Sequence, residues 1–243
     1  MPRSHGTSAS SSSSVRSGLV VGALTICAFV ALVLMLVPVL LVPVGQTGRL
    51  LLTYSIPELG FAAIGLLFLV VIGEDRSFID IDRPTASDAT FTAIASVLLA
   101  GFNLLVHWAF ATAGFSTASR FSMPSGIDPV LLLAGLSVVL VMIVGPSEEL
   151  FFRGVVQRYL DEDLSRLGAY AWTSVIFAAF HLPAVAGTDG GLPQYVLVGG
   201  ILFVVSMSLG WLYDRTRNLL VPAMVHGIYN VLVFASLVFG VMP

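Results

Sequence analysis

Residues 17–48 read SGLVVGALTICAFVALVLMLVPVLLVPVGQTG, without a charged side chain between Arg16 and Arg49. A helix rises about 1.5 Å per residue, so roughly 20 apolar residues are enough to cross the hydrocarbon core of a bilayer. The stretch exceeds that length. It therefore predicts a membrane-spanning helix near the start of the chain.

The composition extends this prediction to the whole molecule. Of 243 residues, 57% are apolar and 10% are charged, whereas about 25% of the residues of an average soluble domain are charged. The mean hydropathy is +0.97, which excludes an ordinary soluble protein. The basic residues are all arginines and the net charge is -3, so no basic patch is expected and nucleic acid is excluded as a partner. The single cysteine, Cys27, excludes a disulfide framework and a cysteine-based metal site.

Further stretches of the same kind follow along the chain, and none alternates with the period of two that a barrel strand would show. Unpaired backbone amides are not tolerated in lipid, so these stretches are expected to be helices. The sequence thus predicts an all-α, polytopic transmembrane helix bundle of about seven spans, within a range of six to eight, with membrane lipid around it. The expected spans are residues 17–48, 50–73, 89–113, 129–147, 167–182, 193–213 and 218–241.

The arginines predict the orientation of these spans. All except Arg49 and Arg120 fall on the side of the N terminus, and cytoplasmic loops carry the excess of basic residues. We expect a multi-pass protein of the cell membrane with a cytoplasmic N terminus. Residues 1–16 are rich in serine and are expected to form a disordered tail, while residues 17–243 form one membrane domain with its catalytic motifs at 145–230.

Ionisable side chains inside spans are costly and ask for a functional reason. They concentrate in three segments, GPSEELFFRG at 145–154, FAAFH at 177–181 and HGIYN at 226–230. Glu149 and Arg153 have the spacing of an ion pair within one helix. Glu148 points about 100° away from its neighbour and is left without that partner, as suits a general base.

The other two segments supply imidazoles and an amide. His226 and Asn230 share one helix face, and His181 lies on a different helix. A carboxylate, two imidazoles and a carboxamide can activate water and stabilise an oxyanion, which predicts hydrolysis. For the three segments to meet at one depth, the helix that carries Glu148 must continue to about Leu160. The site then needs a cavity that admits water, and we expect it to open to the cytoplasm.

Two further polar residues within spans are interpreted as structural. Glu58 follows Pro57 and is expected near the interface, where an acid in the first turn of a helix is favourable. His107 is expected to hydrogen-bond between helices.

At these three segments the sequence resembles the CAAX protease and bacteriocin-processing (CPBP or ABI) family of intramembrane endopeptidases. The family motifs EExxxR, FxxxH and HxxxN occur in order as Glu148-Glu149-Arg153, Phe177-His181 and His226-Asn230. The resemblance covers residues 145–230. Before Gly145 the sequence resembles the family only in its hydropathy.

The resemblance implies a membrane protease in which Glu148 and His181 activate a water while His226 and Asn230 stabilise the oxyanion. Glu149 and Arg153 would support the site, and Glu149 is also a candidate for direct action. Family members have been regarded as metalloproteases and as glutamate-type proteases. We favour a mechanism without a metal, because HExxH is absent. If zinc is used, its expected ligands are Glu148, His181 and His226.

The resemblance also implies a membrane-associated or lipidated peptide or protein as the substrate. Eukaryotic relatives cleave prenylated proteins, and prokaryotic relatives are associated with bacteriocin processing or immunity. Two other classes remain open from the sequence, a catalytically silent scaffold or regulator and a small-solute transporter that uses Glu148 and the histidines as a relay. A transporter is less favoured because no inverted repeat is visible.

Overall fold

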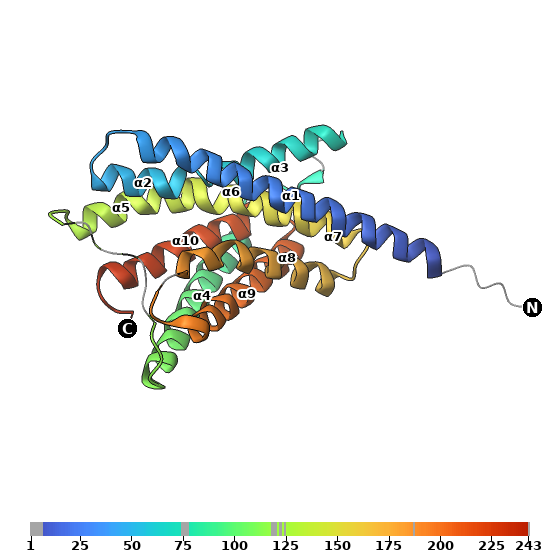
Figure 1. Ribbon diagram of the computed structural model, residues 1–243. Helices are drawn as coiled ribbons and strands as arrows, with labels where there is room; N and C mark the ends of the chain where they lie inside the picture. The colour runs from blue at the N-terminus through green and yellow to red at the C-terminus, as the bar shows by residue number, and fades with distance from the viewer. Residues whose placement is uncertain are drawn as a thin grey trace, which may run out of the picture.

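A computed structural model describes residues 7–73, 78–117, 121, 123, 125–186 and 188–242. Every regular element in this part of the chain is a helix, which confirms the all-α fold. The start of α1 and the end of α10 lie at opposite ends of an elongated bundle (Figure 1). The elements in chain order begin with α1 (Thr7–Leu41), α2 (Gln46–Ser55), α3 (Leu59–Ile72) and α4 (Ala86–Thr112), and end with α8 (Arg166–His181), η4 (Leu182–Val185), α9 (Gly191–Thr216) and α10 (Leu220–Val238).

Between α4 and α8, one long helical segment carries the first of the three motifs, EExxxR. It consists of α5 (Pro129–Val139), η2 (Leu140–Val144), α6 (Gly145–Glu149), η3 (Leu150–Gln157) and α7 (Arg158–Asp161). The prediction that this helix continues to about Leu160 is confirmed. The sequence did not indicate that η2 and η3 are π-helical. Pro146 lacks an N–H and its ring crowds the preceding turn, and the wider turn of η2 just before it accommodates both effects.

Six helices of the described residues are long and apolar enough to cross a membrane. This number lies within the predicted range of six to eight. The seventh stretch, expected at 167–182, forms α8, whose 16 residues extend about 24 Å and fall short of a full crossing. The six segments are Val15–Leu41, Gln46–Ile72, Ala86–Thr112, Pro129–Asp161, Gly191–Thr216 and Leu220–Val238.

The serine-rich start of the chain differs from its prediction. Disorder is expected over residues 1–16, yet α1 begins at Thr7; residues 1–6 lie outside the described part. Once a helix is nucleated, each added residue gains one backbone hydrogen bond. The apolar helix that follows can therefore extend back into the polar segment.

Polar caps define where three of the helices begin. Thr85 and Asp88 form a reciprocal capping box at the start of α4, Asp128 accepts two backbone N–H groups at the start of α5, and Ser165 accepts the N–H of Gly168 at the start of α8. These side chains satisfy amides that have no partner within the helix. The helices thus begin at fixed residues.

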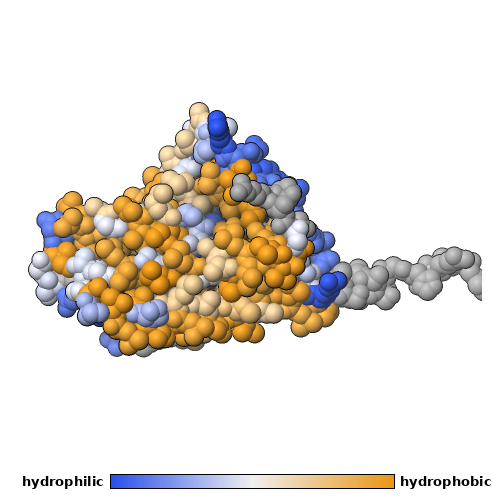
Figure 2. All heavy atoms as spheres, turned by 90° about the horizontal axis from the view of Figure 1, so that it is seen from above, coloured by the Kyte–Doolittle hydropathy of each residue, from blue (hydrophilic) through white to orange (hydrophobic). Residues whose placement is uncertain are grey.

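Two glycines bring α10 against the long helix. A Cβ at Gly145 would lie 2.5 Å from the Ala223 carbonyl oxygen, and a Cβ at Gly227 would lie 2.7 Å from the Val141 Cα. Small residues let membrane helices approach to backbone contact. This approach places the second half of the bundle beside the Glu148-Glu149 segment. On the outside, hydrophobic residues predominate on the face shown in Figure 2, as lipid contact requires.

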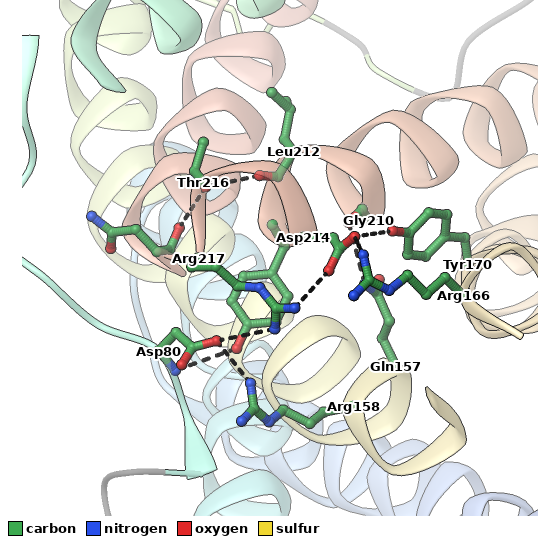
Figure 3. A network of polar contacts seen from close by, with 12 residues as sticks. Asp80, Gln157, Arg158, Arg166, Tyr170, Gly210, Leu212, Asp214, Thr216 and Arg217 are labelled. Carbon is green, nitrogen blue, oxygen red and sulfur yellow. Dashed lines mark hydrogen bonds and ion pairs between the residues drawn. The ribbon is translucent and has the colours of Figure 1, made fainter. Parts of the chain in front are cut away.

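At one end of the bundle, charged and polar side chains from the ends of several helices and from the segment at Asp80 form a network (Figure 3). We call Asp80, Arg158, Arg166, Tyr170, Asp214 and Arg217 the end network. Ser17 of α1 also donates to Asp163 beside it. The loops assigned to the N-terminal side thus meet at one end, while the identification of that side with the cytoplasm stays a prediction. Arg153, sorted with these loops from the sequence, lies instead inside the bundle with 0% exposure.

Candidate active site

Glu149 joins two of the predicted site residues. Its Oε1 accepts from Arg153 Nη1 at 2.9 Å and from His226 Nδ1 at 2.8 Å. The predicted pair of Glu149 with Arg153 is thereby confirmed, and the link to His226 is new. Arg153 Nη2 also donates to the backbone oxygen and the hydroxyl of Ser206 on α9. Arg153 and Glu149 therefore fix the imidazole of α10 and anchor α9 to the long helix.

The bond to Glu149 determines which nitrogen of His226 is available. A carboxylate that is paired with an arginine is ionised and can only accept hydrogen bonds. Nδ1 of His226 is therefore the donor and carries a hydrogen. Nε2 is then the ring nitrogen left to face a substrate. His226 is 2% exposed, and its orientation is set inside the protein.

Glu148 faces a different histidine. Its Oε2 lies 3.5 Å from His181 Nε2, and the Glu148 side chain is almost completely buried. His181 Nδ1 donates to the Phe177 carbonyl at 2.8 Å, which leaves Nε2 directed at the carboxylate. The adjacent glutamates thus lie beside different imidazoles, as their 100° separation on the helix predicts.

Phe177 explains the first position of its motif. Its ring stacks on His181 with centroids 4.5 Å apart and meets His226 edge-on at 5.6 Å. The Arg153 guanidinium lies 5.3 Å above the same ring. One aromatic side chain therefore separates and orients both imidazoles and covers the buried cation.

Asn230 lies one turn after His226 on α10, at the wall of a pocket of about 270 Å³. Apolar side chains dominate this pocket, and its polar lining residues besides Asn230 include Asn103, His107 and Gln194. His107 is predicted to bond between helices, but its Nδ1 bonds the Asn103 backbone oxygen of its own helix. Among the described residues that line this pocket, Asn230 is the one predicted site residue, and it borders a mostly apolar space of a size that suits part of a ligand.

This pocket extends away from the end network. Its lining includes Thr117, Val185 and Met242, which belong to the opposite end of the bundle. A separate pocket of about 310 Å³ at the end network reaches Gln157, one helical turn from Arg153. The described pocket at Asn230 is thus not the opening towards the arginine-rich end that the sequence predicts.

The residues named for a zinc site do not fit one. Among the described residues, no group of three or more His, Cys, Asp or Glu side chains is arranged to hold a metal ion. His181 and His226 face different carboxylates. The observed pairs instead suit proton transfer and charge stabilisation by side chains.

The sequence predicts Glu58 near the membrane interface, and this prediction is wrong. It lies in the middle of the spanning segment Gln46–Ile72, and its carboxyl interacts with Glu148 and His181. The signal was present, because an acid inside an apolar span is a functional candidate by default. Pro57 made a helix start seem a sufficient explanation.

Comparison with known families bears on the same part of the chain. Residues 129–232 match the family model described as type II CAAX prenyl endopeptidase Rce1-like. The matched region contains all three motifs, so the resemblance to CAAX proteases is confirmed, and the family implies a membrane protease. A search among curated proteins found no match.

Proposed function

We propose, from the match of residues 129–232 to this family and from the geometry around Glu148, that the chain is an intramembrane endopeptidase. Glu148 and His181 activate a water molecule, and His226 and Asn230 stabilise the tetrahedral oxyanion. Glu149 and Arg153 position His226. The observation that carries the proposal is the pairing of two buried, adjacent carboxylates with two different imidazoles, at 3.5 Å and 2.8 Å.

The proposed reaction needs one base and one oxyanion site. Glu148 takes a proton from the water as its oxygen attacks the peptide carbonyl, and His181 orients the base. The oxyanion accepts hydrogen bonds from Asn230 and from Nε2 of His226, which requires the imidazolium form, and Glu149 balances that charge. When the tetrahedral intermediate collapses, Glu148 returns the proton to the leaving nitrogen. The products are a carboxylic acid and an amine.

This arrangement divides the work between the two glutamates. Arg153 is a permanent cation paired with Glu149, and the Glu149 Oε1 already accepts hydrogen bonds from Arg153 and His226. Glu148 has no arginine at hydrogen-bonding distance among the described contacts. We therefore assign the base to Glu148, and metal chemistry is not needed for any step.

The proposed substrate is a membrane-associated or lipidated peptide or protein. The pocket beside Asn230 is mostly apolar, and the bundle around it faces lipid. An apolar chain that enters from the bilayer would gain about 25 cal/mol for each Å² of its surface that the pocket covers. The surrounding lipid and the apolar pocket thus both favour a substrate with an apolar chain.

Access to the site is part of the proposal. The protein would lie in the cell membrane with the arginine-rich end in the cytoplasm, and water would approach Glu148 from that side. The polar pocket that reaches Gln157 supports this direction. The apolar pocket reaches the opposite end, so substrate and water would arrive by different routes.

The direct test compares new protein termini in membranes that contain the wild type or Glu148→Gln, at equal amounts of folded protein. Termini that vanish with Glu148→Gln would establish proteolysis and identify the substrate together. The matched control is Glu162→Gln, the same chemical change at an exposed carboxylate, which should leave these termini unchanged. If no termini depend on Glu148 across several growth conditions, the proposal fails and a scaffold becomes the better account.

A further inference from the structure

Glu58 is an acid in the middle of a membrane span that the mechanism above does not use. It lies about 20 Å from either end of Gln46–Ile72. An acid at such a depth costs about 2.5–3.5 kcal/mol on insertion scales. The break between α2 and α3 does not explain why residue 58 is an acid, because Pro57 alone accounts for that break.

The surroundings of Glu58 are those of the active site. In the described part of the chain, the ionisable groups that interact with it are the Glu148 carboxyl of α6, the His181 imidazole of α8 and the Tyr54 hydroxyl of α2. The interaction with Glu148 includes contact between the two carboxyl groups at hydrogen-bonding range. Oε2 of Glu58 and Oε2 of Glu148 are both buried, and in the described part of the chain neither oxygen accepts a hydrogen bond from a donor.

Packing on both sides holds Glu58 at this point. Phe61, one turn further along α3, is 2% exposed and its ring contacts those of Phe151, Phe152 and Phe180. A Cβ at Gly60 would lie 3.2 Å from the Leu32 backbone nitrogen of α1. The start of α3 is therefore fixed between α1 and the long helix, and the carboxyl cannot withdraw from Glu148 without repacking.

Two carboxyl groups in contact cannot both be ionised at low energetic cost, so they share a proton. We propose that Glu58 is a positioning residue of the active site, which in its carboxylic acid form donates a hydrogen bond to Glu148 and holds that base towards the water and His181. The proton stays on Glu58 throughout the cycle. The positioning role of Glu58 in catalysis rests on the proposed function, whereas the proton shared between Glu58 and Glu148 does not depend on it.

Infrared spectroscopy tests the shared proton without any substrate. Wild type in detergent at neutral pH should show the C=O stretch of a carboxylic acid, and Glu58→Gln should abolish it. Glu162→Gln, at an exposed carboxylate, should leave the band unchanged. A wild type without the band, or a band that survives Glu58→Gln, would overturn the proposal even if the protein is a protease.

Kinetics test the positioning role on a peptide that spans the Glu148-dependent cleavage site. Glu58→Leu removes the donor and should lower kcat about 10- to 100-fold per folded protein, as expected when a reacting group loses its orientation, while KM changes less than twofold. Glu58→Gln keeps an N–H donor of the same shape and should restore most of kcat with an altered pH profile. An unchanged kcat in Glu58→Leu, or no rescue by glutamine, would contradict the role. A wild type that cleaves nothing instead contradicts the proposed function.

Discussion

Two polar clusters of the molecule have similar residues and opposite surroundings. The buried cluster consists of Glu148, Glu149, Arg153, His181 and His226. Arg153 and Glu149 are fully buried inside the bundle, whereas the His181 side chain, at its edge, is 31% exposed. In the end network the charged side chains are partly exposed to solvent, from 18% for Asp214 to 64% for its partner Arg166. The same acid and base types meet at similar distances in both, 2.9 Å and 3.0 Å between their closest atoms.

The difference teaches that burial determines what a charge pair does. An exposed pair is solvated, screened by salt and worth about 0–1 kcal/mol. A buried pair has lost its hydration, so each partner depends on the other, and removal of one leaves an uncompensated charge. The end network can therefore vary at little cost, whereas the buried cluster keeps Glu149 and His226 in one fixed arrangement.

The largest effect is expected from breaking the buried pair. Arg153→Leu leaves the Glu149 carboxylate in the core without its cation, which should lower the free energy of unfolding by about 3–5 kcal/mol and abolish cleavage. Unfolding in detergent micelles measures the first effect. In the double variant with Glu149→Leu, most of the stability should return and the activity should not. Equal losses in the single and double variants would show that the pair is not coupled.

A somewhat smaller effect is expected where the buried cluster meets the substrate. Asn230→Ala removes one of the two proposed oxyanion donors and should lower kcat about 100- to 1000-fold, with little change in KM. Asn230 is only partly buried, so the melting temperature should change little. Cleavage kinetics of the purified protein provide the measurement, and wild-type kcat in Asn230→Ala would remove this residue from the mechanism.

The sequence predicts features that lie within one helix better than contacts between helices. The expected spans follow from hydropathy, and the pair of Glu149 with Arg153 follows from spacing within one helix. Contacts across helices are different. That His226 bonds Glu149 depends on the close approach at Gly145 and Gly227, which a single sequence does not specify.

The errors have equally physical causes. Glu58 was interpreted by its neighbour Pro57, although an acid at mid-span depends on which helices surround it. Arg153 was sorted as a loop residue because charge alone does not distinguish a solvated arginine from a buried one. The stretch at 167–182 was expected to cross the membrane because it is apolar, but α8 has only 16 residues and ends at His181, where a 3₁₀ turn follows.

In the end network, a substitution should have a small, salt-dependent effect. Asp80→Asn weakens the pairs with Arg158 and Arg217, at 2.8 Å and 3.7 Å, and should lower the free energy of unfolding by less than about 1 kcal/mol. The difference from wild type should shrink at high salt, and kcat should not change. A loss comparable to that of Arg153→Leu would show that exposure is the wrong explanation for the contrast.

The smallest effect is expected at Tyr170, on α8 at the margin of the end network. Partial burial and its hydrogen bond to Asp214 at 2.8 Å raise the pKa of the Tyr170 hydroxyl to about 12. Because this pKa is higher in the folded than in the unfolded protein, the stabilisation is complete below about pH 10 and is lost as the pH rises towards 12. Tyr170→Phe should therefore unfold slightly more easily than wild type at pH 8 and equally at pH 12. Ultraviolet titration of tyrosinate checks the pKa, and unfolding experiments at both pH values check the stability. If wild type and Tyr170→Phe differed in stability by the same amount at both pH values, the hydroxyl would contribute through packing rather than through its proton.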